Sequence, residues 1–138
     1  MKNFKFRAWD KDHKYMEYTD KNLIVSFGDD GNVDATDLSN IYSTCNGMQN
    51  FELMQSTGLK DKNGTEIYEG DIIDKGYLSK VHDEIGVVKF DKGVDSDGFH
   101  AEVWLGWITD KNSSLLDVHK KCKVLGNIYE NPELLEDN

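Results

Sequence analysis

Residues 57–73, TGLKDKNGTEIYEGDII, contain two turn signals that decide how the middle of this chain folds. Asn63-Gly64 is the pair favoured in a type I′ hairpin turn, because both central residues of that turn need a positive φ. Gly70-Asp71 predicts a second bend, in which the Asp71 carboxylate can accept backbone N–H groups. The two isoleucines that follow predict a buried strand. The stretch therefore predicts a hairpin and the start of a barrel strand, with these four residues as structural turns.

The acidic residues of this stretch do not have the spacing of a metal site. A calcium-binding loop needs acids at alternate positions, glycine at the sixth and glutamate at the twelfth. Counted from Asp61 the sixth residue is Glu66, and counted from Asp30 it is Ala35. The chain has neither GxxxxGKT/S nor GxGxxG, and its histidines and cysteines form no HxxxH or CxxC pair. We therefore expect no metal and no cofactor.

Short apolar or alternating segments recur along the chain, separated by Gly, Asp and Asn. This spacing is typical of an antiparallel barrel or sandwich rather than of βαβ units. At the end of the chain, Asn131 can cap a helix whose first turn holds Pro132, which predicts a short helix at 131–135. The segments predicted to be strands are 4–9, 15–18, 23–27, 48–55, 66–74, 84–91, 98–108 and 122–129.

The predicted fold is mainly β, in the β-rich α+β class. Residues 56–138 are expected to form a small SH3-like β-barrel that ends in the short helix. Residues 1–55 are expected to form a smaller β element packed on the barrel. A barrel is favoured because it hides the edges of about five short strands. With 138 residues in total, the two parts could behave as a single domain.

Three blocks of the sequence resemble the YopX family of bacterial phage and prophage proteins. They are KFRAWDKDHKYM (5–16), TGLKDKNGTEIYEGDII (57–73) and VLGNIYENPELL (124–135), and their order and spacing also match. The resemblance implies a small, mostly β protein encoded by a phage or prophage. It carries no catalytic residue over to this chain.

The charge of the chain argues against direct nucleic-acid binding. The net charge is −10, both halves are acidic and no basic stripe is present, so phosphate backbones should be repelled. The two cysteines lie far apart in no paired motif, which fits a reducing compartment. No apolar run is long enough for a signal peptide or a membrane span. We expect a cytoplasmic location in the bacterial host cell and no membrane contact.

The segment 98–108 alternates in a way that suggests a binding patch. One face, with Phe99, Ala101, Val103, Leu105 and Trp107, is expected to be the core face. The other face then has a Trp and an Ile beside polar residues, and aromatic residues concentrate at interfaces. In the alternative reading, a loop or the N-terminal segment covers this Trp. The first predicted strand also presents an Arg near a Trp, which could stack as a recognition pair. The residues predicted to bind a partner are His100, Glu102, Trp104 and Ile108, together with Arg7 and Trp9.

These observations predict a non-enzymatic phage or prophage accessory protein that binds a host or phage protein and could modulate host physiology or defence. One alternative is a small-ligand or nucleotide-binding protein, or an enzyme, with a site of scattered histidines and carboxylates. A second alternative is an acidic mimic of nucleic acid. Self-association as a homo-oligomer is compatible with each of these functions, since edge strands and aromatic residues invite it.

Overall fold

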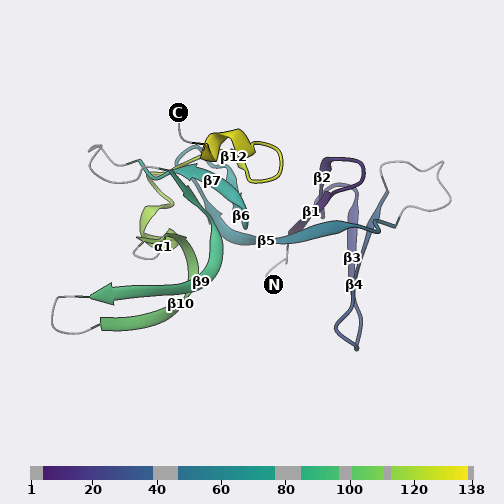
Figure 1. Ribbon diagram of the computed structural model, residues 1–138, viewed down its shortest axis with the longest axis horizontal. Coiled ribbons are helices and arrows are strands. Elements are labelled where there is room, and N and C mark those ends of the chain that lie inside the picture. The colour runs from purple at the N-terminus through teal and green to yellow at the C-terminus, as the bar shows by residue number, and fades with distance from the viewer. Residues whose placement is uncertain (1–4, 39–46, 77–84, 97–100, 111–112, 137–138) are drawn as a thin grey trace. The chain divides into compact units, whose positions relative to one another are not determined.

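The computed structural model describes residues 5–38, 47–76, 85–96, 101–110 and 113–136 (Figure 1). The chain divides into two compact units, Met1–Ser56 and Thr57–Asn138. Strands make up more than half of the described residues in each unit, and a single short α-helix occurs among the described residues. The prediction of a mainly β fold is confirmed. No helix within the described ranges is long and apolar enough to cross a bilayer.

The first unit is built from two groups of antiparallel strands. In one group, β1 lies between β2 and the first half of β5, so β1 is a central strand. In the other group, β3 and β4 form a hairpin. The core of this unit is Ala8, Leu23, Ala35 and Met48, against which Tyr15, Val25, Phe51 and Leu53 pack. The strands are β1 (Phe6–Asp10), β2 (Tyr15–Tyr18), β3 (Leu23–Phe27), β4 (Val33–Asp37) and β5 (Phe51–Lys60).

The second unit begins where β5 pairs with β6. One three-stranded sheet has the order β12-β7-β8, and another has the order β11-β10-β9. The core is Ile67, Ile73, Val88, Leu115, Val118 and Cys122. The elements are β6 (Glu66–Tyr68), β7 (Asp71–Asp74), β8 (Ile85–Val87), β9 (Lys89–Ser96), β10 (Ala101–Asp110), β11 (Ser113–Ser114), the helix α1 (Leu115–Val118), β12 (Lys123–Asn127) and the 3₁₀ helix η1 (Pro132–Leu135).

The segment 85–96 belongs to both sheets of the second unit. Its first part, β8, pairs with β7, and its second part, β9, pairs with β10. The switch occurs at Val88, whose N–H donates to the Asp71 carbonyl at 2.9 Å. A strand that passes from one sheet to the next turns a corner between them. The unit therefore curls like a half-barrel, as the bent ribbon of β9 and β10 shows (Figure 1).

The hairpin between β5 and β6 is present, but its turn is not of type I′. Gly64 has φ 83°, and Lys14 is the single non-glycine residue with positive φ among those described, so Asn63 lacks the positive φ that type I′ requires. Instead the Gly64 N–H donates to the Asp61 carbonyl and the Asp61 N–H to the Thr65 carbonyl. This is a three-residue loop, a type I turn with a glycine bulge. The Asp61 carboxylate favours it by accepting the N–H groups of Asn63 and Thr65.

The second turn and the last helix lie where the sequence placed them. Gly70 has φ 86°, and the Asp71 carboxylate accepts the Tyr68 N–H at 2.8 Å, so the predicted role of Asp71 is confirmed. The C-terminal helix is a 3₁₀ helix with Pro132 in its first turn. Asn131 precedes it but makes no side-chain cap, because its Oδ1 accepts the Asn127 N–H.

Candidate protein-binding surface

The β9–β10 hairpin has two different faces. In an antiparallel pair, residues directly opposite one another project to the same side. The register pairs Trp107 with Phe90, Leu105 with Lys92 and Trp104 with Gly93. One face therefore carries Phe90, Lys92, Val103, Leu105 and Trp107, and the other carries Lys89, Asp91, Trp104 and Ile108.

The first of these faces is buried at its base and open beyond it. At the base, Trp107 packs against the core of the second unit and meets Phe90 edge-on, with ring centroids 5.2 Å apart. Beyond this pair, Val103 and Leu105 are each 66% exposed, and Phe90 is 52% exposed. We call these three exposed side chains, Phe90, Val103 and Leu105, the apolar hairpin face.

The prediction that Val103 and Leu105 are core residues is therefore wrong. The alternation in 98–108 identifies two faces correctly, but the core extends under the hairpin only as far as Trp107. Phe99 lies outside the described residues, and so does the side chain of Ala101. Val103 and Leu105, which were expected to be inside, are thus the most exposed apolar side chains among those described in the hairpin.

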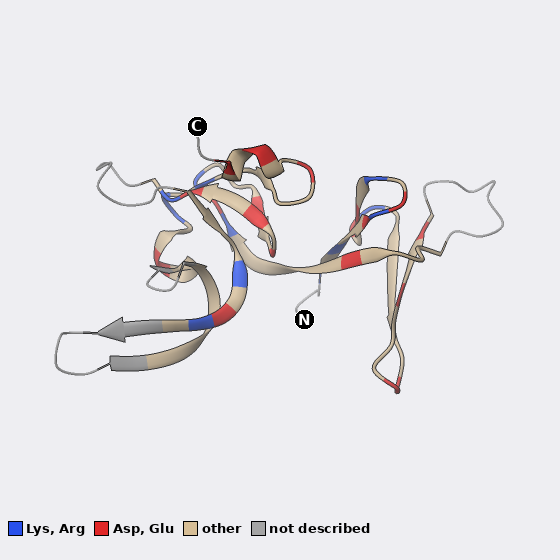
Figure 2. Ribbon diagram, viewed as in Figure 1, with Lys and Arg blue, Asp and Glu red and all other residues tan. Residues whose placement is uncertain are grey.

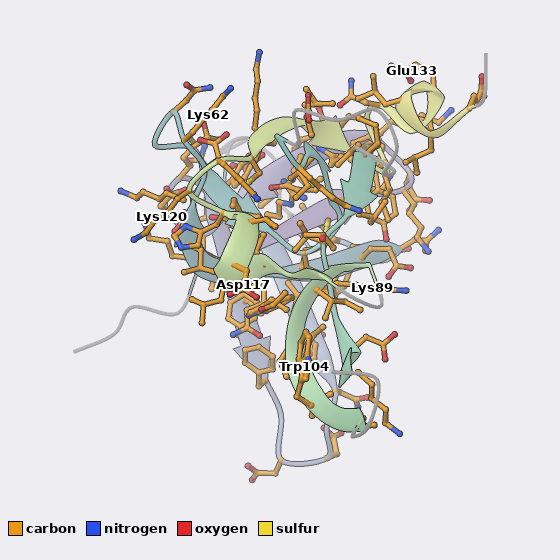
Figure 3. The ribbon with its side chains drawn as sticks, turned by 90° about the vertical axis from the view of Figure 1, so that its left-hand side faces the viewer. Lys62, Lys89, Trp104, Asp117, Lys120 and Glu133 are labelled. Carbon is orange, nitrogen blue, oxygen red and sulfur yellow. The ribbon has the colours of Figure 1, made fainter. Side chains whose placement is uncertain are left out.

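Trp104 lies on the opposite face and packs on its own hairpin. A Cβ placed on Gly93 would collide with the six-membered ring of the Trp104 indole, so the indole covers the Gly93 backbone directly. A Cβ placed on Gly106 would lie at van der Waals distance from the same ring. Its Nε1 is shielded from solvent and has no acceptor among the described residues. Figure 3 shows Trp104 lying along the ribbon of β10. Trp104 is thus half-buried and braces the hairpin.

Two of the other predicted patch residues are buried. Ile108 was expected on a wet face but is buried, because both faces of the hairpin are covered at its base. Arg7 was expected to point outward and is also buried. β1 is a central strand, and Met54, directly opposite Arg7 in β5, is buried as well, so this face of the sheet is covered too. Trp9 is half-buried.

The residues predicted to bind a partner are divided between the two units. Arg7 and Trp9 belong to the first unit, whereas Trp104 and Ile108 belong to the second. His100 lies outside the described residues, and so does the side chain of Glu102 in β10. Sequence reasoning missed Phe90 and Lys92. Gly93 was a signal that this segment is a strand in contact with another group, since a glycine inside a strand often marks such a close approach, here by the Trp104 ring.

A buried carboxylate ties the base of this unit together. Asp61 accepts the N–H groups of Asn63, Thr65 and Val124, each at 2.9 Å. Burial raises the pKa of the Asp61 carboxyl, but the three N–H donors outweigh it and hold the pKa below its usual value. Asp61 therefore stays ionised and joins the β5–β6 loop to β12.

The buried thiol beside this carboxylate is unreactive by the same physics. Burial, and then the negative charge of Asp61, raise the pKa of Cys122 to about 11. Its Sγ donates a weak hydrogen bond to the His119 carbonyl. A thiol with this pKa is almost fully protonated at neutral pH and is a poor nucleophile. Cys122 therefore contributes to packing.

The histidines that the structure describes make contacts that support the fold. The His119 Nδ1 lies 2.9 Å from the Lys60 carbonyl, which links α1 to the end of β5. The His13 Nδ1 lies 3.0 Å from the Asp10 carboxylate. Within the described ranges, no group of three or more His, Cys, Asp or Glu side chains is placed to hold a metal ion. The exposed apolar hairpin face is a feature of this unit that a partner could recognise.

Comparison with known proteins gives a family and a fold. A family model described as "YopX protein" matches residues 5–136. No curated protein matches the chain. Protein yopX from Bacillus subtilis has a similar structure, with 22% identity over 97% of each chain and a TM-score of 0.60, a likeness that concerns the fold alone. Protein EF1440 from Enterococcus faecalis is 28% identical over 99% of this chain and 100% of its own, with a TM-score of 0.48.

Proposed function

Because the chain belongs to the YopX family, we propose that it is a non-enzymatic phage or prophage accessory protein that binds a protein partner through the apolar hairpin face. The observation that carries the proposal is the exposure of Phe90, Val103 and Leu105 side by side on one face of a hairpin. Single exposed apolar residues are ordinary on a protein surface, but contiguous ones mark interaction sites. Whether the protein modulates host physiology or defence depends on which protein binds this face.

The hairpin presents this face on a rigid support. Trp107 anchors one side of the base in the core and holds Phe90 by the edge-on ring contact. On the other side, the Trp104 indole covers the backbone at Gly93. A surface that is already ordered loses less conformational entropy on binding, which favours affinity.

The outer edge of β9 opposes the addition of another strand at one point, which favours the face as the site. β9 is the edge strand of its sheet among the described strands. The Val88 N–H points to the side of β7, and Lys92, four residues later, directs its N–H the same way. There the Asp91 carboxylate accepts the Lys92 N–H at 2.7 Å. An edge donor that a charged side chain occupies is not available to another strand.

The proposal is supported over the acidic-mimic alternative by the arrangement of charge. A mimic of nucleic acid needs acids aligned along one face at phosphate-like spacing. Along the described ribbons, Lys and Arg are interspersed with Asp and Glu, and the start of β9 alternates between the two signs (Figure 2).

The test is capture from bacterial lysate with the purified chain as bait, followed by mass spectrometry. Leu105→Ser should abolish capture of a specific protein while the far-ultraviolet circular dichroism stays unchanged. Leu116→Ser is the matched control, because Leu116 is 67% exposed but lies on α1, and it should capture as the unaltered chain does.

Equal capture by the Leu105→Ser and unaltered chains would show that the hairpin face is not the site. Turnover of a nucleotide, peptide or nucleic acid that a point substitution abolishes would overturn the non-enzymatic assignment.

A further inference from the structure

The side of the hairpin that has the apolar hairpin face also has a positive charge. Lys92 lies on it, opposite Leu105, and is exposed. Among the described residues, Lys92 has no ion pair, whereas Lys89 and Asp91 lie on the other face within 3.8 Å of each other. A good occupant of this face therefore offers apolar side chains with a carboxylate beside them. This complementarity would set the register of the contact as well as add to its affinity.

The C-terminal segment of the same chain has the complementary chemistry. None of the residues of η1 is buried, and Leu134 and Leu135 are 38% and 46% exposed. Glu133 and Glu136 flank the two leucines and are exposed too. Figure 2 shows acidic residues in red at η1. The segment thus presents two apolar side chains between two carboxylates.

This segment is held in place although none of its residues is fully buried. The Asn127 Oδ1 accepts the N–H groups of Tyr129 and Glu130, at 3.0 and 2.8 Å. The Asn131 Oδ1 accepts the Asn127 N–H at 3.2 Å. The loop that leads into η1 is therefore ordered by its own side chains, and the leucines are displayed to solvent on a defined support.

Within one copy, the two surfaces lie at opposite ends of the second unit. Figure 1 shows η1 beside β12, on the far side of the unit from the β9–β10 hairpin, and Figure 3 shows Glu133 and Trp104 at opposite ends of the view. A contact between them has to form between two copies. We infer that the apolar hairpin face of one copy binds the segment Glu133–Glu136 of a second copy. This inference rests on the proposed role of the face in binding proteins, and it adds a second copy of the chain to the partners that the face accepts.

Such a contact joins two different surfaces and is therefore heterologous. Each copy offers one face and one C-terminal segment, so the contact can repeat and produce a closed ring or an open chain. The surfaces are small, and small interfaces are usually weak. Association should consequently depend on protein concentration and grow weaker as salt screens the Lys92 carboxylate contact.

The deciding experiment uses two full-length variants, each with one surface removed. Leu105→Ser removes the face and keeps the segment, and the double substitution Leu134→Ser/Leu135→Ser removes the segment and keeps the face. Each variant alone should be monomeric by sedimentation velocity. Their equimolar mixture should form a one-to-one complex, because a single intact face meets a single intact segment. The unaltered chain should form larger assemblies as concentration rises.

A charge exchange tests the role of the cation. Lys92→Glu should weaken self-association roughly five- to tenfold, since an attractive pair becomes repulsive. Adding Glu133→Lys and Glu136→Lys to the same chain should restore it. Circular dichroism of every variant should match that of the unaltered chain, because all of these side chains are exposed.

Three results would overturn the inference. They are an unaltered chain that stays monomeric at all concentrations, a segment variant that dimerises by itself, and a mixture that forms no complex. Failure here is distinguishable from failure of the proposed function. A monomeric chain that still captures another protein in a Leu105-dependent way would contradict the inference and leave the proposed function intact.

Discussion

The Trp104 indole lies directly over the backbone of Gly93, its partner across the β9–β10 ladder. A large ring that covers a glycine shields the ladder on that side and fills the space that a side chain at Gly93 would occupy. Trp104 therefore stabilises the hairpin from one face, while Val103 and Leu105 remain exposed on the other. The separation of a bracing face from a binding face leads to the first two predictions.

Gly93→Ala should destabilise the protein, although alanine usually suits a strand better than glycine does. The new Cβ would collide with the Trp104 ring and force it away. The cost should be about 1–3 kcal/mol in the free energy of unfolding, measured by urea denaturation. Gly47→Ala is the control, because a Cβ there meets nothing within 4 Å, and it should change stability little. A Gly93→Ala chain as stable as the unaltered one would contradict the packing.

Trp104→Ala should also lower stability, by about 2 kcal/mol, because a half-buried ring that covers the ladder is lost. If Trp104 belonged to an exposed binding patch, as the sequence predicted, this substitution would leave folding largely intact and weaken partner capture. From the structure we expect Trp104→Ala mainly to lower stability. Leu105→Ser should instead abolish capture and leave the fold intact. Thermal unfolding and capture measured on both variants separate the two roles. Loss of capture in Trp104→Ala with an unchanged melting temperature would restore the original interpretation.

Asp61→Asn should cost about 2–3 kcal/mol at pH 7, because an ionised acceptor of three backbone N–H groups is replaced by a neutral one. The contribution of Asp61 should also depend on pH. Its pKa in the folded chain lies below the usual 3.8, so the unfolded chain binds the proton more readily. The stabilisation is complete above that usual value and is lost as the pH falls through the folded pKa.

Urea denaturation at a series of pH values between about 2 and 7, the range in which a carboxyl titrates, measures this pH dependence of stability. The difference in unfolding free energy between the unaltered and Asp61→Asn chains should shrink as the pH falls. Asp29→Asn is the control, because Asp29 is exposed, and it should change the unfolding free energy little. A difference that stays constant with pH would mean that the charge of Asp61 is unimportant.

Cys122 should react very slowly with a thiol reagent in the folded protein. With a pKa of about 11, roughly one thiol in a thousand is ionised at pH 8, and the side chain is buried as well. The assay uses a Cys45→Ser chain, so that the signal comes from Cys122 alone. The rate of reaction with an aromatic disulfide should rise by orders of magnitude in urea. Fast labelling without denaturant would show that the thiol is accessible.

The sequence was most informative where local chemistry determines the backbone. Gly70, Asp71 and Pro132 each act on the residues beside them, and the structure has a bend or a helix at each predicted place. The turn at Asn63-Gly64 was assigned the wrong type, because the carboxylate of Asp61, two residues earlier, satisfies the loop N–H groups in another geometry.

Burial was harder to predict, because it depends on distant parts of the chain. Alternation separates the two faces of a strand but does not say which face meets the core, or for how many residues. In β10 the core ends at Trp107, so Val103 and Leu105 are exposed on the same face. Arg7 is buried because β1 is a central strand, and that depends on the pairing of β1 with β5 about 45 residues away.

The carboxylate of Asp61 also bears on how the second unit forms during synthesis. It is satisfied partly by its own loop and partly by the Val124 N–H, 63 residues further along the chain. Domains emerge from the ribosome from the N-terminal side first, so the β5–β6 hairpin is made long before its last hydrogen-bond donor. Until β12 has been translated, water must solvate the Asp61 oxygen that later accepts the Val124 N–H. The unit can close only as a whole, and a chain interrupted before Val124 should remain open and be degraded.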